Sequence, residues 1–168
     1  NKGEDAFKQK LEGIISKTGD IPLGLYECPV PYKRLVSSEI MKCLAESGRF
    51  LYHKDTSCDK NNISQKLAVI KDTGFQLYNA DTPTALDSLK DGAKGISPIS
   101  GNFYPEFYGH FLKEYYLKGV TPELEKLSDL LIVMDAVTHN FYPWSAKLFL
   151  QKRGLPIAAN TRLPFPGM

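Results

Sequence analysis

The segment Arg49 to Ser57, RFLYHKDTS, decides how the rest of the chain is interpreted. A short apolar run ends in the single lysine Lys54, and polar residues follow at once. This pattern predicts a buried strand that delivers an amine to the end of a sheet. Taken alone, the segment favours an ordinary strand whose lysine reaches water. The residues elsewhere in the chain change that interpretation.

The overall composition is that of an ordinary globular protein. Its 168 residues are 42% hydrophobic and 24% charged, and their formal net charge is +2. We therefore expect one soluble domain that binds no nucleic acid. The sequence contains neither a run of about 18 apolar residues nor a signal-peptide pattern. A cytoplasmic protein without membrane contact is predicted.

The three cysteines, Cys28, Cys43 and Cys58, show no spacing typical of a metal site. We predict that they are free, buried thiols and that the protein holds no metal.

Helix-like and strand-like segments alternate over the first hundred residues. Ser37 or Ser38 can cap one helix, which Gly48 ends. Four strands separated by helices predict a parallel α/β architecture with right-handed crossovers. In such a sheet, the active site lies at the carboxyl ends of the strands. The other predicted helices are 4–17, 63–71 and 83–89, and the predicted strands are 21–26, 50–54, 75–78 and 95–99.

The rest of the chain has no strand pattern. Residues 104–116, 122–137 and 144–153 predict three helices packed beside the α/β part. Residues 163–167 predict an extended tail.

Tyr26 and Lys54 end two consecutive predicted strands. Their side chains are therefore expected at the same end of neighbouring parallel strands. A lysine amine can attack a ketone to form an imine, and a tyrosine hydroxyl can move protons to and from the substrate. The pair therefore points to carbonyl chemistry.

An ordered series of motifs resembles the dihydrodipicolinate synthase and N-acetylneuraminate lyase family of class I, Schiff-base aldolases. The series spans the chain from about Gly19 and is more specific than any one of its motifs. The motifs are LYECP at 25–29, YHKDTSCD at 52–59, LYNAD at 77–81, GAKGIS at 92–97, SGN at 100–102, YPWSAK at 142–147 and RLP at 162–164.

The resemblance implies a TIM (β/α)8 barrel fold, of which this chain would be the C-terminal half-barrel, with four parallel strands, plus a C-terminal three-helix extension. Residues 1–102 would form the half-barrel and residues 103–168 the extension. The first four strands would precede Asn1, together with a threonine- or serine-bearing loop, and we expect the 168 residues alone to be inactive. The alternative is a half-barrel that dimerises through its open sheet edges.

The resemblance also implies the roles of individual residues. Lys54 would be the imine-forming nucleophile and Tyr26 the proton relay. Ala80, through its backbone carbonyl, and Ile96 and Ser97 would line the substrate pocket. The substrate would be a 2-keto acid such as pyruvate, no cofactor would be needed, and the protein would be a homo-oligomer, either dimer or tetramer.

Several residues depart from the family pattern. Pro31 stands where the synthases carry an arginine, and only a shifted loop would let Lys33 or Arg34 replace it. Glu27 replaces a common asparagine. We therefore expect an aldolase or lyase for a 2-keto acid of sugar-acid type rather than a true dihydrodipicolinate synthase. The alternative is a non-catalytic small-molecule binder on the same barrel.

His53 precedes the lysine, at a position where the family usually has a small or apolar residue. Side-chain alternation places it on the sheet face opposite Lys54, so we interpret it as a structural histidine.

Overall fold

A computed structural model describes residues 2–31 and 33–162. The chain divides into two compact units. The first consists of the residues up to 79 together with 87–95, and the second consists of residues 80–86 together with those from 96 onward. The elements, in order, are α1 (Lys2–Lys17), β1 (Leu23–Tyr26), α2 (Ser38–Glu46), β2 (Phe50–Asp55), α3 (Lys60–Ile70), β3 (Gln76–Asn79), α4 (Ala85–Lys90), β4 (Gly95–Ile96), the 3-10 helix η1 (Ile99–Asn102), α5 (Pro105–Lys118), α6 (Pro122–Thr138) and α7 (Trp144–Lys152).

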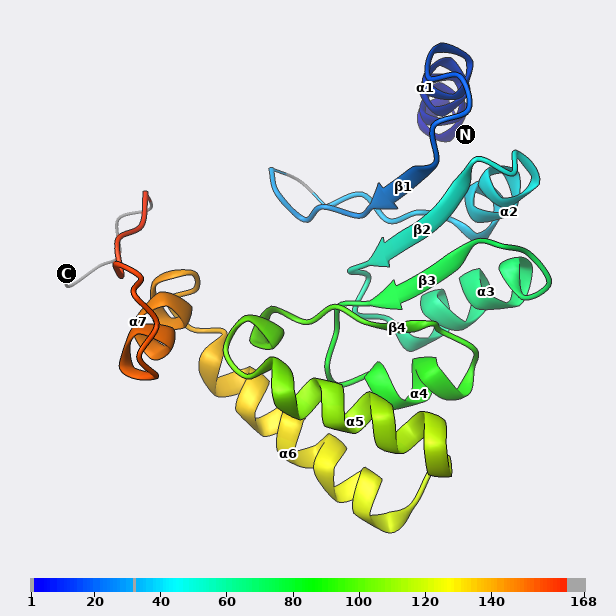
Figure 1. Ribbon diagram of the computed structural model, residues 1–168. Helices are drawn as coiled ribbons and strands as arrows, with labels where there is room; N and C mark the ends of the chain where they lie inside the picture. Colours follow the sequence, from blue (N-terminus) through cyan, green and yellow to red (C-terminus); the bar gives the residue numbers. More distant parts are fainter. Residues whose placement is uncertain (1, 32, 163–168) are drawn as a thin grey trace. The chain divides into compact units, whose positions relative to one another are not determined.

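The strands form one sheet in the order β1-β2-β3-β4. β1 pairs with β2 and β2 with β3, both in parallel (Figure 1). The register shifts early in β2: Leu23 faces Phe50, but Gly24 faces Tyr52. One extra residue in β2 turns Phe50 to the buried side, and regular alternation then continues to the strand end.

Helices α2 and α3 lie on one face of this sheet (Figure 1). Their apolar faces meet the strands in a core in which Met41 is fully buried and Phe50 is 3% exposed. This burial follows from the helical spacing of the apolar residues. The other main members of the core are Leu11, Val36, Ile40, Leu44, Ile63, Leu67, Ile70, Phe75, Leu77 and Ala93.

Side-chain caps decide where the two helices begin. Ser37 caps α2 by accepting a hydrogen bond from the Ile40 amide, as predicted. Asp59 caps α3 by accepting from the amides of Asn61 and Asn62. Because of this cap, α3 begins three residues before the predicted start at residue 63.

The predicted strand 95–99 is wrong in its second half. β4 ends at Ile96, and η1 begins at Ile99. Pro98 lies between them and has no amide hydrogen to donate to a sheet. The extended tail predicted for residues 163–167 lies outside the described residues.

The second unit contains the three predicted C-terminal helices. A buried polar cluster lies at its centre: the Tyr108 hydroxyl is 2.5 Å from Ser100 Oγ and 3.2 Å from Thr82 Oγ1, and Ser100 also donates to Asp135. Burial raises the pKa of Tyr108 above its ordinary value, so the hydroxyl stays protonated and can donate.

The prediction for the cysteines is right in one respect and wrong in another. All three are free thiols, but Cys28 and Cys58 are exposed and Cys43 is only partly buried. Cys28 and Cys58 lie in the loops that follow β1 and β2, and loops run over the surface.

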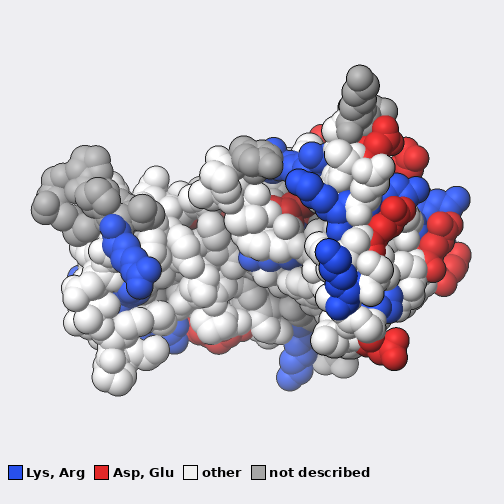
Figure 2. Space-filling model, turned by 90° about the horizontal axis from the view of Figure 1, so that it is seen from above, with Lys and Arg blue, Asp and Glu red and all other residues white. Residues whose placement is uncertain are grey.

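The surface carries both signs of charge. On the face drawn in Figure 2, lysine and arginine side chains lie interspersed with aspartate and glutamate. Within residues 2–31 and 33–162, no helix has the length and hydropathy needed to span a bilayer.

Candidate active site

Tyr26 and Lys54 are partners in the sheet register, at the carboxyl ends of β1 and β2. Lys54 Nζ lies 5.0 Å from the centre of the Tyr26 ring. The two side chains are thus together, as the strand pattern predicted. Tyr26 is 49% exposed and Lys54 is partly buried, so a small molecule can reach both.

Tyr78 extends this row of side chains to a third strand. It pairs in register with Lys54 from the other side, and its ring lies 4.9 Å from the ring of Tyr52. Tyr26, Lys54 and Tyr78 are therefore register neighbours on one sheet face, and the Tyr78 hydroxyl donates to Gln76 Oε1 at 3.3 Å. Sequence reasoning did not single out Tyr78, although its place at the end of the next strand was the available signal.

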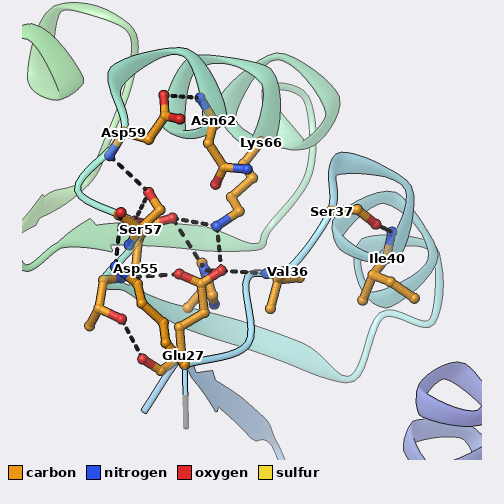
Figure 3. Close-up of polar contacts among 12 residues, drawn as sticks. Glu27, Val36, Ser37, Ile40, Asp55, Ser57, Asp59, Asn62 and Lys66 are labelled. Carbon is orange, nitrogen blue, oxygen red and sulfur yellow. Dashed lines mark hydrogen bonds and ion pairs between the residues drawn. The ribbon is translucent and has the colours of Figure 1, made fainter. Parts of the chain in front are cut away.

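The opposite face of the same strand ends carries a buried ionic cluster of Glu27, Asp55 and Lys66 (Figure 3). His53 belongs to the same cluster, with its Nε2 3.7 Å from Asp55 Oδ2. His53, Asp55 and Lys66 are 0% exposed and Glu27 is 2% exposed. His53 lies on the face opposite Lys54, as alternation predicted, and packs edge-on against Phe75.

Lys66 supplies the positive charge of the cluster. Its Nζ donates to Glu27 Oε1 at 2.5 Å and to Asp55 Oδ2 at 2.6 Å. Burial on its own raises the pKa of Asp55, but the neighbouring His53 ring, the Lys66 ammonium and the Ser57 hydroxyl outweigh burial and hold that pKa well below its ordinary value. Asp55 is therefore an anion.

Further hydrogen bonds to both carboxylates come from three backbone amides and one hydroxyl. Glu27 Oε1 also accepts from the Val36 amide at 2.6 Å, and Glu27 Oε2 accepts from the Thr56 amide at 3.1 Å. Asp55 Oδ1 accepts from the amide and the hydroxyl of Ser57, at 2.8 and 2.7 Å. A buried charge is tolerated only with such partners.

The cluster resembles a metal site in one respect, because Glu27, His53 and Asp55 offer ligand atoms within 4.8 Å of one another. The Lys66 ammonium, however, already binds both carboxylates. A divalent cation would have to displace it into an apolar interior. The residues therefore do not fit a metal ion.

Lys33 and Arg34, the candidate replacements for the missing arginine, are both engaged with backbone carbonyls. Lys33 Nζ donates to the Ser57 carbonyl at 2.9 Å. Arg34 donates to the Gly3 carbonyl at 2.7 Å, and its guanidinium lies 4.4 Å from the ring centre of Phe7. A substrate carboxylate would have to compete with these contacts.

The predicted pocket residues Ala80, Ile96 and Ser97 belong to the second unit. Ala80 follows β3, Ile96 ends β4, and all three are partly buried. That these three residues line one substrate pocket with Lys54 stays a prediction.

Comparisons with known proteins show the family of this chain. A model of the dihydrodipicolinate synthetase family matches residues 3–168. A 4-hydroxy-tetrahydrodipicolinate synthase of Acaryochloris marina is 23% identical over 163 residues, which cover 97% of this chain and 55% of that protein. The chain thus spans about half the length of the curated relatives it matches.

Two solved structures show the fold. The dihydrodipicolinate synthase of Thermotoga maritima has a TM-score of 0.80 at 18% identity, covering 94% of this chain and 54% of that chain. The 2-keto 3-deoxygluconate aldolase of Picrophilus torridus has a TM-score of 0.74 at 21% identity, covering 89% of this chain and 54% of that chain. The predicted half-barrel of four strands with helices is confirmed, and the chain belongs to the dihydrodipicolinate synthetase family.

Proposed function

We propose that the protein is a class I aldolase or lyase that forms an imine between Lys54 and a 2-keto acid. The observation that carries this proposal is the register pairing of Lys54 with Tyr26, with Nζ 5.0 Å from the centre of the ring. An amine and a phenol at the carboxyl ends of adjacent strands are the two groups that imine chemistry needs.

The chemistry assigns one role to each group. The Lys54 amine attacks the ketone carbon, and the resulting carbinolamine loses water to give the imine. The imine draws electrons from the bond between the substrate's α- and β-carbons. This bond breaks, its electron pair becomes the enamine double bond, and the β-carbon leaves as an aldehyde once its hydroxyl has lost a proton. The Tyr26 hydroxyl moves protons to and from the substrate.

A sugar-derived 2-keto acid is the proposed substrate. Pro31 replaces the arginine expected for a true dihydrodipicolinate synthase, and Lys33 and Arg34 are both engaged elsewhere. One solved structure with the same fold is a 2-keto 3-deoxygluconate aldolase. Cleavage of such an acid by this mechanism yields pyruvate, so pyruvate is a suitable probe for the whole class.

Borohydride reduction tests the proposal. The complete protein, incubated with pyruvate and borohydride, should gain the mass of one reduced adduct on Lys54. Lys54→Met should abolish the adduct, whereas Lys42→Met, which removes an exposed lysine of α2, should leave it unchanged. Absence of an adduct, or an adduct on another lysine, would show the proposal to be wrong.

A non-catalytic keto-acid binder is the second candidate, and the engaged Lys33 and Arg34 favour it. It predicts pyruvate binding without turnover. Aldol cleavage that is lost in Lys54→Met would exclude it.

We also propose a homo-oligomer. In the described sheet β1 pairs only with β2, and its other edge would pair either with further strands of the same protein or with a second copy. Light scattering of the complete protein tests this, and a monomeric mass would contradict it.

A further inference from the structure

The ammonium of Lys66 joins two carboxylates, each of which immediately follows a proposed catalytic residue. Glu27 follows Tyr26 at the end of β1, and Asp55 follows Lys54 at the end of β2. Lys66 comes from α3 and reaches both carboxylates from the helix-covered face of the sheet (Figure 3).

Side-chain alternation couples the two faces. Consecutive residues of a strand point to opposite sides, so the position of Glu27 constrains Tyr26 and the position of Asp55 constrains Lys54. Further contacts tie the two strand ends together: the Glu27 amide donates to the Lys54 carbonyl at 3.2 Å, and the Thr56 hydroxyl donates to the Glu27 carbonyl. Lys66 is the charged centre of this connection.

Stability alone does not account for such a centre. Well-packed apolar residues of similar volume often serve a protein core as well as a buried ion pair does, because desolvation offsets the attraction between the charges. Apolar contacts, however, lack the directional preference of hydrogen bonds. Two short hydrogen bonds from one ammonium specify where each carboxylate lies, and therefore how the ends of β1 and β2 are placed.

We propose that Lys66 is a positioning residue, which holds the Tyr26 hydroxyl and the Lys54 amine in the geometry that proton transfer requires. This inference rests on the proposed function of Lys54 and Tyr26. It predicts separate effects on two steps. The imine needs the Lys54 amine and accumulates at saturating pyruvate even where it forms more slowly, so trapping should persist without Lys66. Proton transfer at the methyl carbon needs Tyr26 and Lys54 together and should be impaired.

Pyruvate separates these steps experimentally. Borohydride trapping reports the imine. Exchange of the pyruvate methyl protons for deuterium reports the next step: a methyl proton leaves, its C–H electron pair forms the enamine double bond, and a deuteron from the solvent then returns to the carbon. The exchange rate in D2O, followed by NMR, thus measures proton transfer without knowledge of the aldehyde partner.

Variants of the complete protein provide the test. Lys66→Met removes the ammonium but leaves two buried carboxylates without their cation. A triple variant adds Glu27→Gln and Asp55→Asn, which removes those charges and restores stability without restoring the ammonium. Lys42→Met, at an exposed position of α2, is the matched control. Thermal unfolding establishes which variants are folded.

In the triple variant we expect trapping on Lys54 at saturating pyruvate, with methyl exchange slowed at least about tenfold, because small misplacements of reacting groups cost this much or more. Lys66→Arg, which keeps the charge, should recover part of the rate. If the folded triple variant exchanges at the wild-type rate, Lys66 has a structural role only and the inference is wrong. If the wild-type protein forms no adduct, the proposed function fails, which is a separate result.

Discussion

Gly95 lies against the ring of Tyr78 so closely that a β-carbon on it would come within 2.7 Å of a ring carbon. Tyr78 cannot easily move aside, because its other neighbours are Tyr52, 4.9 Å away between ring centres, and Lys54 in the register. The glycine is therefore required by packing and not by a positive φ.

Gly95→Ala should destabilise the fold by about 1–3 kcal/mol, the usual cost of overpacking a core. Gly13→Ala is the matched control: a β-carbon at this position of α1 would have no neighbour within 4 Å, and alanine should stabilise that helix by about 0.5–1 kcal/mol. Urea unfolding of both variants measures the difference. Equal midpoints for the two would contradict the contact with Tyr78.

Tyr26→Phe should slow pyruvate methyl exchange by about 10²–10⁴-fold, the range that a positioned acid or base contributes. Trapping on Lys54 should persist, because the amine remains. Tyr52→Phe, on the same face but earlier in its strand, should leave the rate essentially unchanged. Exchange at the wild-type rate in Tyr26→Phe would remove Tyr26 from the mechanism.

Lys66→Met should lower the free energy of unfolding by about 3–5 kcal/mol, because it leaves Glu27 and Asp55 buried without their cation. The triple variant that also removes both charges should recover most of this loss. Lys42→Met should change stability by less than about 0.5 kcal/mol. Urea unfolding at neutral pH provides the measurement. If Lys66→Met leaves the free energy of unfolding unchanged, the two carboxylates must find other partners.

Asp55 should make stability depend on pH in the acid range. Its pKa is lower in the folded protein than its ordinary value of 3.8, so the unfolded chain binds the proton more tightly. The contribution of Asp55 to stability is fully present at pH values above the ordinary pKa of 3.8 and is lost as the pH falls through the lower pKa of the folded protein. The stability gap between wild type and Asp55→Asn should therefore shrink in acid.

Urea unfolding at a series of pH values below neutrality checks this sign. Asp72→Asn, at an exposed position of the same unit, should run parallel to wild type. A gap that stays constant or widens in acid would contradict the lowered pKa of Asp55.

Much of the fold was predictable because the signals are local. Among the described residues, the change from strand alternation to helical spacing located each α-helix and strand but not η1, and the order of the elements predicted the parallel sheet. The errors lie at element ends: α3 begins earlier because Asp59 caps it, and β4 ends at Ile96, ahead of Pro98. The exposed Cys28 and Cys58 were missed because cysteine type predicts burial better than loop position does.

The candidate site was predictable in part. Tyr26 and Lys54 end consecutive strands, and parallel pairing of such strands brings their ends together, so the sequence sufficed to find the pair. Lys66 carried a weaker signal, since it lies on the apolar face of α3 with Ile63 and Ile70. A lysine there is usually expected to reach water along the helix surface.

By itself, the sequence determined the parallel α/β alternation of helices and strands and the pairing of Lys54 with Tyr26, because both follow from periodicity and from order along the chain; the half-barrel was implied by the resemblance to a known family. Only the tertiary structure decided that Lys66 is fully buried between Glu27 and Asp55. The reason is physical: a buried ammonium is stable only where carboxylates from other elements meet it, and that meeting depends on how α3 packs against β1 and β2.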